Sequence, residues 1–229
     1  MNWYLKEPTE KKKNSGDGKF IDYLLAGTEY HKKKITKKYA EKIKGTDPEL
    51  YKNLQKIIID WLRDNNRYSR CVKRIEYDKI LPNETSFYSE KLINDTDRKN
   101  WLSKSLEHLS ECKLVFLDPD NGIDFEDENR STKHVYLNEI EAYFRKNKSL
   151  VIYQHADRDT KGFNKVIEKK TNQLMKLLEL KNDEIICLRY KRGSARAFFI
   201  VMQQEHSDCI TNAINHFLKT KWGKHFTEI

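Results

Sequence analysis

The segment Leu114-Val115-Phe116-Leu117-Asp118-Pro119-Asp120-Asn121-Gly122 decides the predicted fold. Four consecutive apolar residues, 114–117, end abruptly at an aspartate. An unbroken apolar run is typical of a strand that is covered on both faces, as in a parallel sheet. Because ligands gather at the carboxyl ends of the strands in such sheets, the polar residues that follow Leu117 form the candidate site.

The rest of the second half alternates helices and strands. The predicted elements are, in order, a helix at 137–146, a strand at 150–153 that ends at Gln154-His155, a helix at 163–180, strands at 184–190 and 195–202, and a helix at 207–219. The two late strands are joined by Lys191-Arg192-Gly193-Ser194, which suits a hairpin. This order predicts an α/β fold: a Rossmann-like, mostly parallel sheet with helices on both faces and a C-terminal β-hairpin.

The first half is more helical and more basic. Thr46-Asp47-Pro48-Glu49 is a helix start, and apolar residues then recur at helical spacing to Leu62. The segment 31–44, rich in lysine, predicts either a surface helix or an irregular basic arm. The remaining predicted elements are short strands at 2–5 and 85–88 and helices at 67–80 and 96–111. We expect one α/β domain over residues 1–229, with a helical and basic insertion at about 30–82.

The charge balance favours a polyanionic partner. Lys and Arg number 44 against 35 Asp and Glu, a net charge of +9 in 229 residues. Cations that neutralise phosphates release counterions, so we expect nucleic acid to be the partner. A lysine-rich solvated surface is the structural alternative.

Cysteine usage and hydropathy exclude several classes of protein. The four cysteines, Cys71, Cys112, Cys187 and Cys209, form no C-x-x-C pair, which speaks against a thiolate zinc site and a disulfide scaffold. The N-terminus lacks an apolar stretch of signal-peptide length, and no segment approaches the ~20 apolar residues that span a bilayer. The prediction is a cytoplasmic protein without a membrane partner.

The candidate catalytic residues are Asp118, Pro119, Asp120, Asn121 and His155. A carboxylate placed directly after a buried strand costs folding energy unless a partner binds it, and the residues after it supply acceptors, an amide and a tight turn. Such a segment can hold an exocyclic amine, a hydroxyl or a hydrated metal. A strand-ending Asx turn is the structural alternative, but it leaves Asp118 unexplained.

A second set of residues predicts contact with nucleic acid. Arg158, Lys191, Arg192 and Arg196 lie near the ends of the predicted strands, and Tyr190 adds an aromatic ring to the cationic hairpin. Such a tract can hold phosphate and stack on a base. A solvated hairpin tip is the alternative.

The apolar strand followed by Asp118-Pro119-Asp120-Asn121 resembles the fourth motif of class I amino-group methyltransferases, in which a strand runs into D-P-P-Y. Among characterised enzymes, the chain is similar to the 23S ribosomal RNA adenine-N6 methyltransferases. It also resembles a bacterial and phage family that shares the signatures LDPDNG and YQH. The resemblance implies that Asp118 orients the target amine, that Pro119 offers it a carbonyl, that Asn121 replaces the stacking aromatic, and that S-adenosylmethionine is the cofactor.

Three functions therefore stay open from the sequence. The first is a methyltransferase-like protein that acts on or binds nucleic acid, with S-adenosylmethionine-dependent methylation of an amino group. The second is a metal-dependent nuclease or phosphodiesterase in which Asp118, Asp120 and His155 bind Mg²⁺ or Mn²⁺. The third is a non-catalytic nucleic-acid or protein-binding module on a degenerate methyltransferase scaffold.

Overall fold

The computed structural model describes residues 1–5, 21–30, 37–64, 72–124, 131–155, 162–191 and 196–229, without the side chains of 37–39 and 64. The chain divides into two compact units. Pro8–Thr85 form the first, which we call the helical unit, and Met1–Glu7 with Ser86–Ile229 form the second, the sheet unit. A single domain with an insertion at about 30–82 stays a prediction.

The helical unit contains η1 (Asp22–Leu24), α1 (Lys37–Thr46), α2 (Pro48–Asp64) and α3 (Lys73–Tyr77). The predicted start of α2 is confirmed, because Asp47 Oδ1 accepts a hydrogen bond from the backbone N–H of Leu50 at 3.0 Å, as an N-cap does. Tyr51 packs in the small core of this unit and donates from its hydroxyl to the Tyr23 carbonyl at 2.7 Å. Of the predicted helix at 67–80, residues 73–77 are helical, and 67–71 lie outside the described residues.

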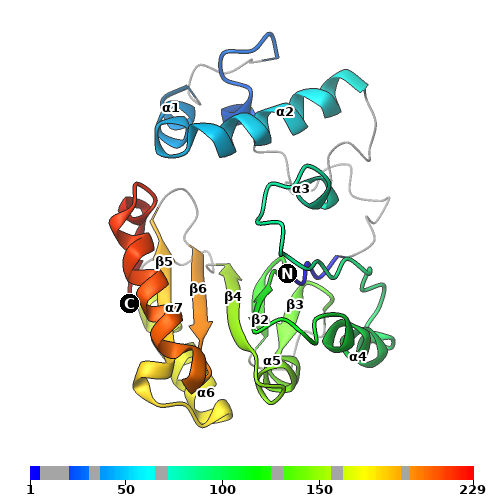
Figure 1. The fold of residues 1–229 in the computed structure, drawn as a ribbon, viewed down its shortest axis with the longest axis vertical. Coiled ribbons are helices and arrows are strands. Elements are labelled where there is room, and N and C mark those ends of the chain that lie inside the picture. The colour runs from blue at the N-terminus through cyan, green and yellow to red at the C-terminus, as the bar shows by residue number, and fades with distance from the viewer. Residues whose placement is uncertain (6–20, 31–36, 65–71, 125–130, 156–161, 192–195) are drawn as a thin grey trace. The chain divides into compact units, whose positions relative to one another are not determined.

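The sheet unit is built on a mixed five-stranded sheet, shown in Figure 1. The strands are β1 (Leu114–Leu117), β4 (Ser149–His155), β5 (Ile185–Tyr190), β6 (Arg196–Val201) and β7 (Phe226–Glu228). Their order is β1-β4-β6-β5-β7. Within this described sheet β1 and β4 are the one parallel pair of strands, and the other three pairs are antiparallel.

The predicted Rossmann-like, mostly parallel sheet is therefore wrong. The two strands that were predicted to form a hairpin, β5 and β6, do pair, but β6 lies between β4 and β5 and is antiparallel to both. Ala197, Phe199, Ile200 and Val201 are buried because β6 is central in the sheet. An apolar run reports that a strand is covered on both faces, and it carries no information about the direction of the neighbouring strand.

The N-terminal residues pair with the edge strand β1 without forming a full strand. Asn2 makes isolated parallel bridges with Leu117 and with Tyr88. The backbone N–H of Asn2 donates to Phe116 O at 2.8 Å, and Asn2 O accepts from the N–H of Asp118 at 3.0 Å. Tyr4 has φ of 48°, in the left-handed region, so the extended backbone is interrupted there. The predicted strands at 2–5 and 85–88 thus reduce to single bridges.

Helices cover both faces of the sheet. The helices α4 (Arg98–His108), α5 (Leu137–Phe144) and α6 (Phe163–Leu178) contribute to the main core, and α7 (Gln204–Lys219) packs on the opposite face. The predicted helices at 96–111, 137–146, 163–180 and 207–219 are confirmed to within a few residues. Among the helices of the described ranges, none is long and apolar enough to cross a bilayer.

Side chains alternate between these two faces along each strand. On β4, Leu150, Ile152 and Gln154 are buried on the face of the main core. Val151 packs with the α7 cluster instead, and Tyr153 and His155 follow it at alternate positions. We call these two sides of the sheet the core face and the α7 face.

Two short strands were missed by the sequence pattern. The strands β2 (Gly122–Asp124) and β3 (His134–Tyr136) form a separate parallel pair that follows the candidate loop. Each has three residues, which is too short for an alternating or continuous apolar pattern to be recognised.

A buried ion pair ties α4 to α5. Arg98 donates from Nε to Glu139 Oε1 at 2.6 Å and from Nη2 to Oε2 at 2.8 Å, and both residues are almost fully buried. The guanidinium also lies 3.7 Å from the centroid of the Tyr136 ring. Glu139 Oε2 accepts a further bond from the backbone N–H of Tyr136 at 2.9 Å, at the first turn of α5.

Candidate functional site

The candidate residues lie where β1 and β4 end. These strands are parallel, and Leu117 is paired with Ile152, so the loop that starts at Asp118 and the end of β4 at His155 are at the same edge of the sheet. The N-terminal end of β6 reaches this edge as well, because Arg196 is paired with His155. The predicted proximity of the two polar strand ends is confirmed. We call this part of the molecule the strand-end site.

Gln154 holds the loop against β4. Its side chain is buried on the core face, where Oε1 accepts a hydrogen bond from the N–H of Ile123 at 2.9 Å. Its amide nitrogen donates to the backbone oxygens of Asn121 at 3.3 Å and of His155 at 2.8 Å. Gln154 is therefore a positioning residue for the loop and does not line an open polar rim.

Gly122 makes this close approach possible. Its φ is +101°, and a Cβ atom at this position would lie 2.6 Å from Cδ and from Oε1 of Gln154. A side chain at residue 122 would therefore be strained in its backbone and would displace Gln154.

Asp118 is the most perturbed carboxyl group of the strand-end site. It is partly buried, and this burial together with the negative charge of Asp120 raises its pKa to about 7. Among the described residues, none donates a hydrogen bond to the Asp118 carboxylate, while its backbone N–H donates to Asn2. A partly desolvated acceptor without a protein donor is costly, so this carboxyl group is a natural place for a donor that is brought by a ligand.

Tyr153, His155 and Arg196 lie close to one another on the α7 face, and Asp118 is near enough to Tyr153 to act on it through charge. The Tyr153 hydroxyl lies 3.0 Å from Nδ1 of His155. Burial raises the pKa of Tyr153, and Asp118 adds to the rise, whereas the charge of Arg196 and its hydrogen bond to the hydroxyl oppose it. Asp118 and Arg196 therefore both act on Tyr153, so an acidic and a cationic group lie near the same phenol.

The other predicted residues of the loop have more structural roles. Pro119 is buried. Asp120 is exposed, and its Oδ2 lies 3.6 Å from Nζ of Lys133. The backbone of Asn121 donates to the Lys133 carbonyl at 2.9 Å and accepts from the N–H of His155 at 3.3 Å.

The predicted nucleic-acid contacts are placed in part. Arg196 belongs to the strand-end site, and Lys191 is exposed just after β5, with its N–H donating to His225 O at 2.8 Å. Arg158 and Arg192 lie outside the described residues. Tyr153 was missed as a site residue. The signal for it was its position two residues before His155, which places both side chains on one face.

Within the described ranges, no group of three or more His, Cys, Asp or Glu side chains is arranged to hold a metal ion. Metal binding by Asp118, Asp120 and His155, and binding of S-adenosylmethionine, stay predictions.

No protein-family model, no curated protein and no solved structure matches this chain. The fold defines the class of the sheet unit as an α/β protein with a mixed sheet. Its function is therefore inferred from the strand-end site itself.

Proposed function

We propose that the sheet unit is a nucleic-acid-modifying enzyme in which the Asp118 carboxylate accepts a hydrogen bond from a donor group of the substrate. The observation that supports this proposal is the partly buried Asp118 carboxyl group, to which no described residue donates a hydrogen bond. An exocyclic amine of a base or a sugar hydroxyl would supply the missing donor. A pKa of about 7 lets the same carboxyl group take up a proton from such a donor near neutral pH.

The neighbours of Asp118 support an anionic substrate. Arg196 carries a positive charge at the same edge of the sheet, and Lys191 is exposed just after β5. An arginine can bind a phosphate through two parallel hydrogen bonds, which fixes the substrate's orientation as well as its affinity. The net charge of +9 favours the same class of partner over long range.

Transfer of a group to an amine is the reaction that this arrangement serves best. The amine would donate to Asp118 and present its lone pair to the incoming group, and its proton would leave to the carboxylate. Methyl transfer is the case that the D-P-D-N resemblance implies, and S-adenosylmethionine would supply the methyl group. The mixed sheet removes fold-level support for this cofactor, so the proposal rests on the Asp118 environment.

Hydrolysis of a phosphodiester is the second candidate, and the pair Asp118 and Asp120 favours it. Mg²⁺ is often bound by one or two carboxylates together with waters and substrate phosphates, so two aspartates can suffice once the substrate is present. Asp120 is exposed and interacts with Asp118 through charge.

The test is a pair of assays on the full chain. Purified protein is incubated with DNA or RNA and radiolabelled S-adenosylmethionine to detect methyl transfer, and with end-labelled strands and Mg²⁺ or Mn²⁺ to detect cleavage. We expect one reaction, lost in Asp118→Asn and kept in the matched variant Asp208→Asn, whose carboxylate is exposed on α7. Neither reaction, with nucleic-acid binding intact, would overturn the enzyme proposal in favour of a binding module.

A further inference from the structure

One line of paired residues crosses four strands at the edge that carries the strand-end site. His155 of β4 is paired with Arg196 of β6, Arg196 with Tyr190 of β5, and Tyr190 with Phe226 of β7. Directly paired residues of antiparallel strands point to the same face of a sheet. The four side chains therefore stand side by side on the α7 face, and we call them the site-end row.

The aromatic part of this row is held rigidly from below. The Phe226 ring lies 5.0 Å from the Phe217 ring of α7 and 6.1 Å from the Phe198 ring of β6. Tyr190 is half-buried, and its ring centroid lies 5.3 Å from that of Phe226. Tyr190 is thus a partly exposed ring on a fixed aromatic support, and next to it η5 (Gly223–His225) places His225 at 6.5 Å.

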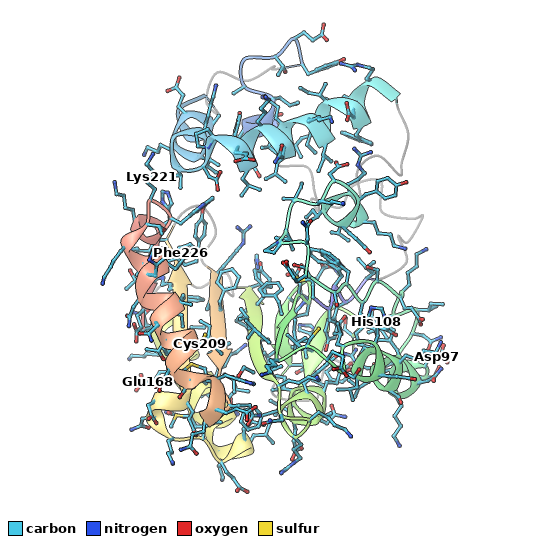
Figure 2. The ribbon with its side chains drawn as sticks, viewed as in Figure 1. Asp97, His108, Glu168, Cys209, Lys221 and Phe226 are labelled. Carbon is cyan, nitrogen blue, oxygen red and sulfur yellow. The ribbon has the colours of Figure 1, made fainter. Side chains whose placement is uncertain are left out.

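Cations border these rings. Lys191, Lys221 and Lys224 are exposed in the segments around Tyr190 and η5, and Figure 2 shows Lys221 and Phe226 at the same end of the sheet unit. Arg189 does not belong to this surface, because it alternates with Tyr190 along β5. Its Nη1 donates to Asn164 Oδ1 at 2.8 Å on the core face. The α7 face therefore carries the combination of flat rings and positive charges.

We propose that the site-end row binds single-stranded nucleic acid, with a base stacked on Tyr190 and phosphates bound by Arg196 and Lys191. This inference rests on the proposed function, because it names the form of nucleic acid that reaches Asp118. A ring can stack only on a base whose face is open, and in a duplex each base already stacks on its neighbours. Tyr190 and His155 are two strand spacings apart, about 10 Å. A base on Tyr190 thus places an adjacent nucleotide over the strand-end site.

Two variants separate stacking from charge in a binding assay. Fluorescence anisotropy with a labelled oligonucleotide, as a single strand and as a duplex, gives the Kd at several salt concentrations. Tyr190→Ala should weaken binding of the single strand by about tenfold and leave the salt dependence unchanged. Arg196→Gln should lower the slope of log K against log salt by about 0.7, as expected for one lost phosphate contact on a single strand.

Controls address the fold and general charge. Tyr190→Phe should bind like the unchanged protein. Tyr190→Leu, which keeps apolar packing on Phe226, should bind as weakly as Tyr190→Ala with an unchanged melting temperature. Two control variants, Lys146→Gln and Tyr77→Ala, should bind normally. Lys146 is an exposed lysine shortly before β4, and the Tyr77 side chain in the helical unit is 84% exposed.

The outcomes keep the two proposals apart. Equal binding of duplex and single strand, with no effect of Tyr190→Leu, would overturn the single-strand inference even if an Asp118-dependent reaction is found. Conversely, single-strand binding that depends on Tyr190, together with no reaction, would leave the inference intact and overturn the proposed enzyme.

Discussion

Gln154 fastens the end of β4 to Asn121, with its amide nitrogen 3.3 Å from the backbone oxygen of that residue. The same side chain accepts from Ile123 and donates to His155 O, so all of its hydrogen-bonding groups are used by backbone. A buried side chain that satisfies three backbone groups fixes a loop more firmly than surface turns do. We call these three hydrogen bonds of Gln154 the clamp, and the positions of Asp118 and Asp120 depend on it.

Replacement of Gly122 by alanine should test the clamp. The new Cβ would meet the Gln154 side chain at 2.6 Å, and φ of +101° disfavours any residue but glycine. We expect Gly122→Ala to lower the free energy of unfolding by about 2 kcal/mol or more. The measurement is urea unfolding at neutral pH.

Gly45→Ala is the matched control, because a Cβ on Gly45 meets no atom within 4 Å and the residue lies in α1. It should raise stability by about 0.5–1 kcal/mol, since alanine is the better helix former. A Gly122→Ala variant as stable as the unchanged protein would show that the loop can accommodate a Cβ atom beside Gln154, contrary to this prediction.

Asp118→Asn should change how stability depends on pH. The pKa of Asp118 is about 7 in the folded chain, against 3.8 for an ordinary aspartate. Between these values the unfolded chain has released the proton and the folded chain keeps it, so stability falls as the pH rises. The cost is present above about pH 7, absent below about pH 4, and on the order of 4 kcal/mol at most.

The asparagine variant lacks this titration. Its stability relative to the unchanged protein should therefore rise between pH 4 and pH 8, which denaturant unfolding at both pH values measures. Asp208→Asn, at an exposed position, should follow the pH dependence of the unchanged protein. If Asp118→Asn and the unchanged protein lose stability in parallel with rising pH, Asp118 ionises as an ordinary carboxyl group.

The reaction rate should follow the same ionisation. When Asp118 accepts the proton of a substrate amine or hydroxyl, only the carboxylate form is active. The value of kcat/KM should then rise with pH up to about 7 and level off above it. A profile that is flat from pH 5 to 8 would assign proton transfer to another group.

The buried Arg98–Glu139 pair should dominate the stability of the sheet unit. Arg98→Met leaves the Glu139 carboxylate buried without its cation, and we expect a loss of about 3–5 kcal/mol. Adding Glu139→Gln removes the buried charge and keeps an acceptor for the Tyr136 N–H. The double variant should therefore recover about 1–3 kcal/mol in the same unfolding assay.

An exposed pair supplies the comparison. Arg145, the residue after α5, places its Nη2 2.7 Å from Oε1 of Glu141 at the surface. Arg145→Met should lower the free energy of unfolding by about 1 kcal/mol or less. Similar losses for Arg98→Met and Arg145→Met would contradict the role assigned to burial.

The sequence predicted most element positions because the patterns that locate them are local. The run 114–117 and the capped start at Asp47 each report their own segment, and both are confirmed. Strand direction and order depend on contacts that no local pattern records, so the place of β6 between β4 and β5 was missed. The strands β2 and β3 escaped because three residues carry too little periodicity.

The residues of the candidate site were likewise predicted only in part. Asp118 and His155 were chosen as candidates because polar residues at the ends of apolar strands are visible in sequence. Their association with Tyr153 and Arg196 needed the antiparallel pairing of β4 with β6. The buried role of Arg98 had no signal, because its partner Glu139 is 41 residues away and neither sits in an apolar pattern.

The alternation along β4 constrains how this protein can vary. Tyr153 and His155 lie on the α7 face, whereas Gln154 between them lies on the core face and holds the loop through hydrogen bonds. Insertion or deletion of one residue in this strand would turn the aromatic and imidazole groups into the core and expose the clamp, losing both at once. Substitutions at 153 and 155 therefore leave the loop attached to β4, whereas a change in the length of this strand does not.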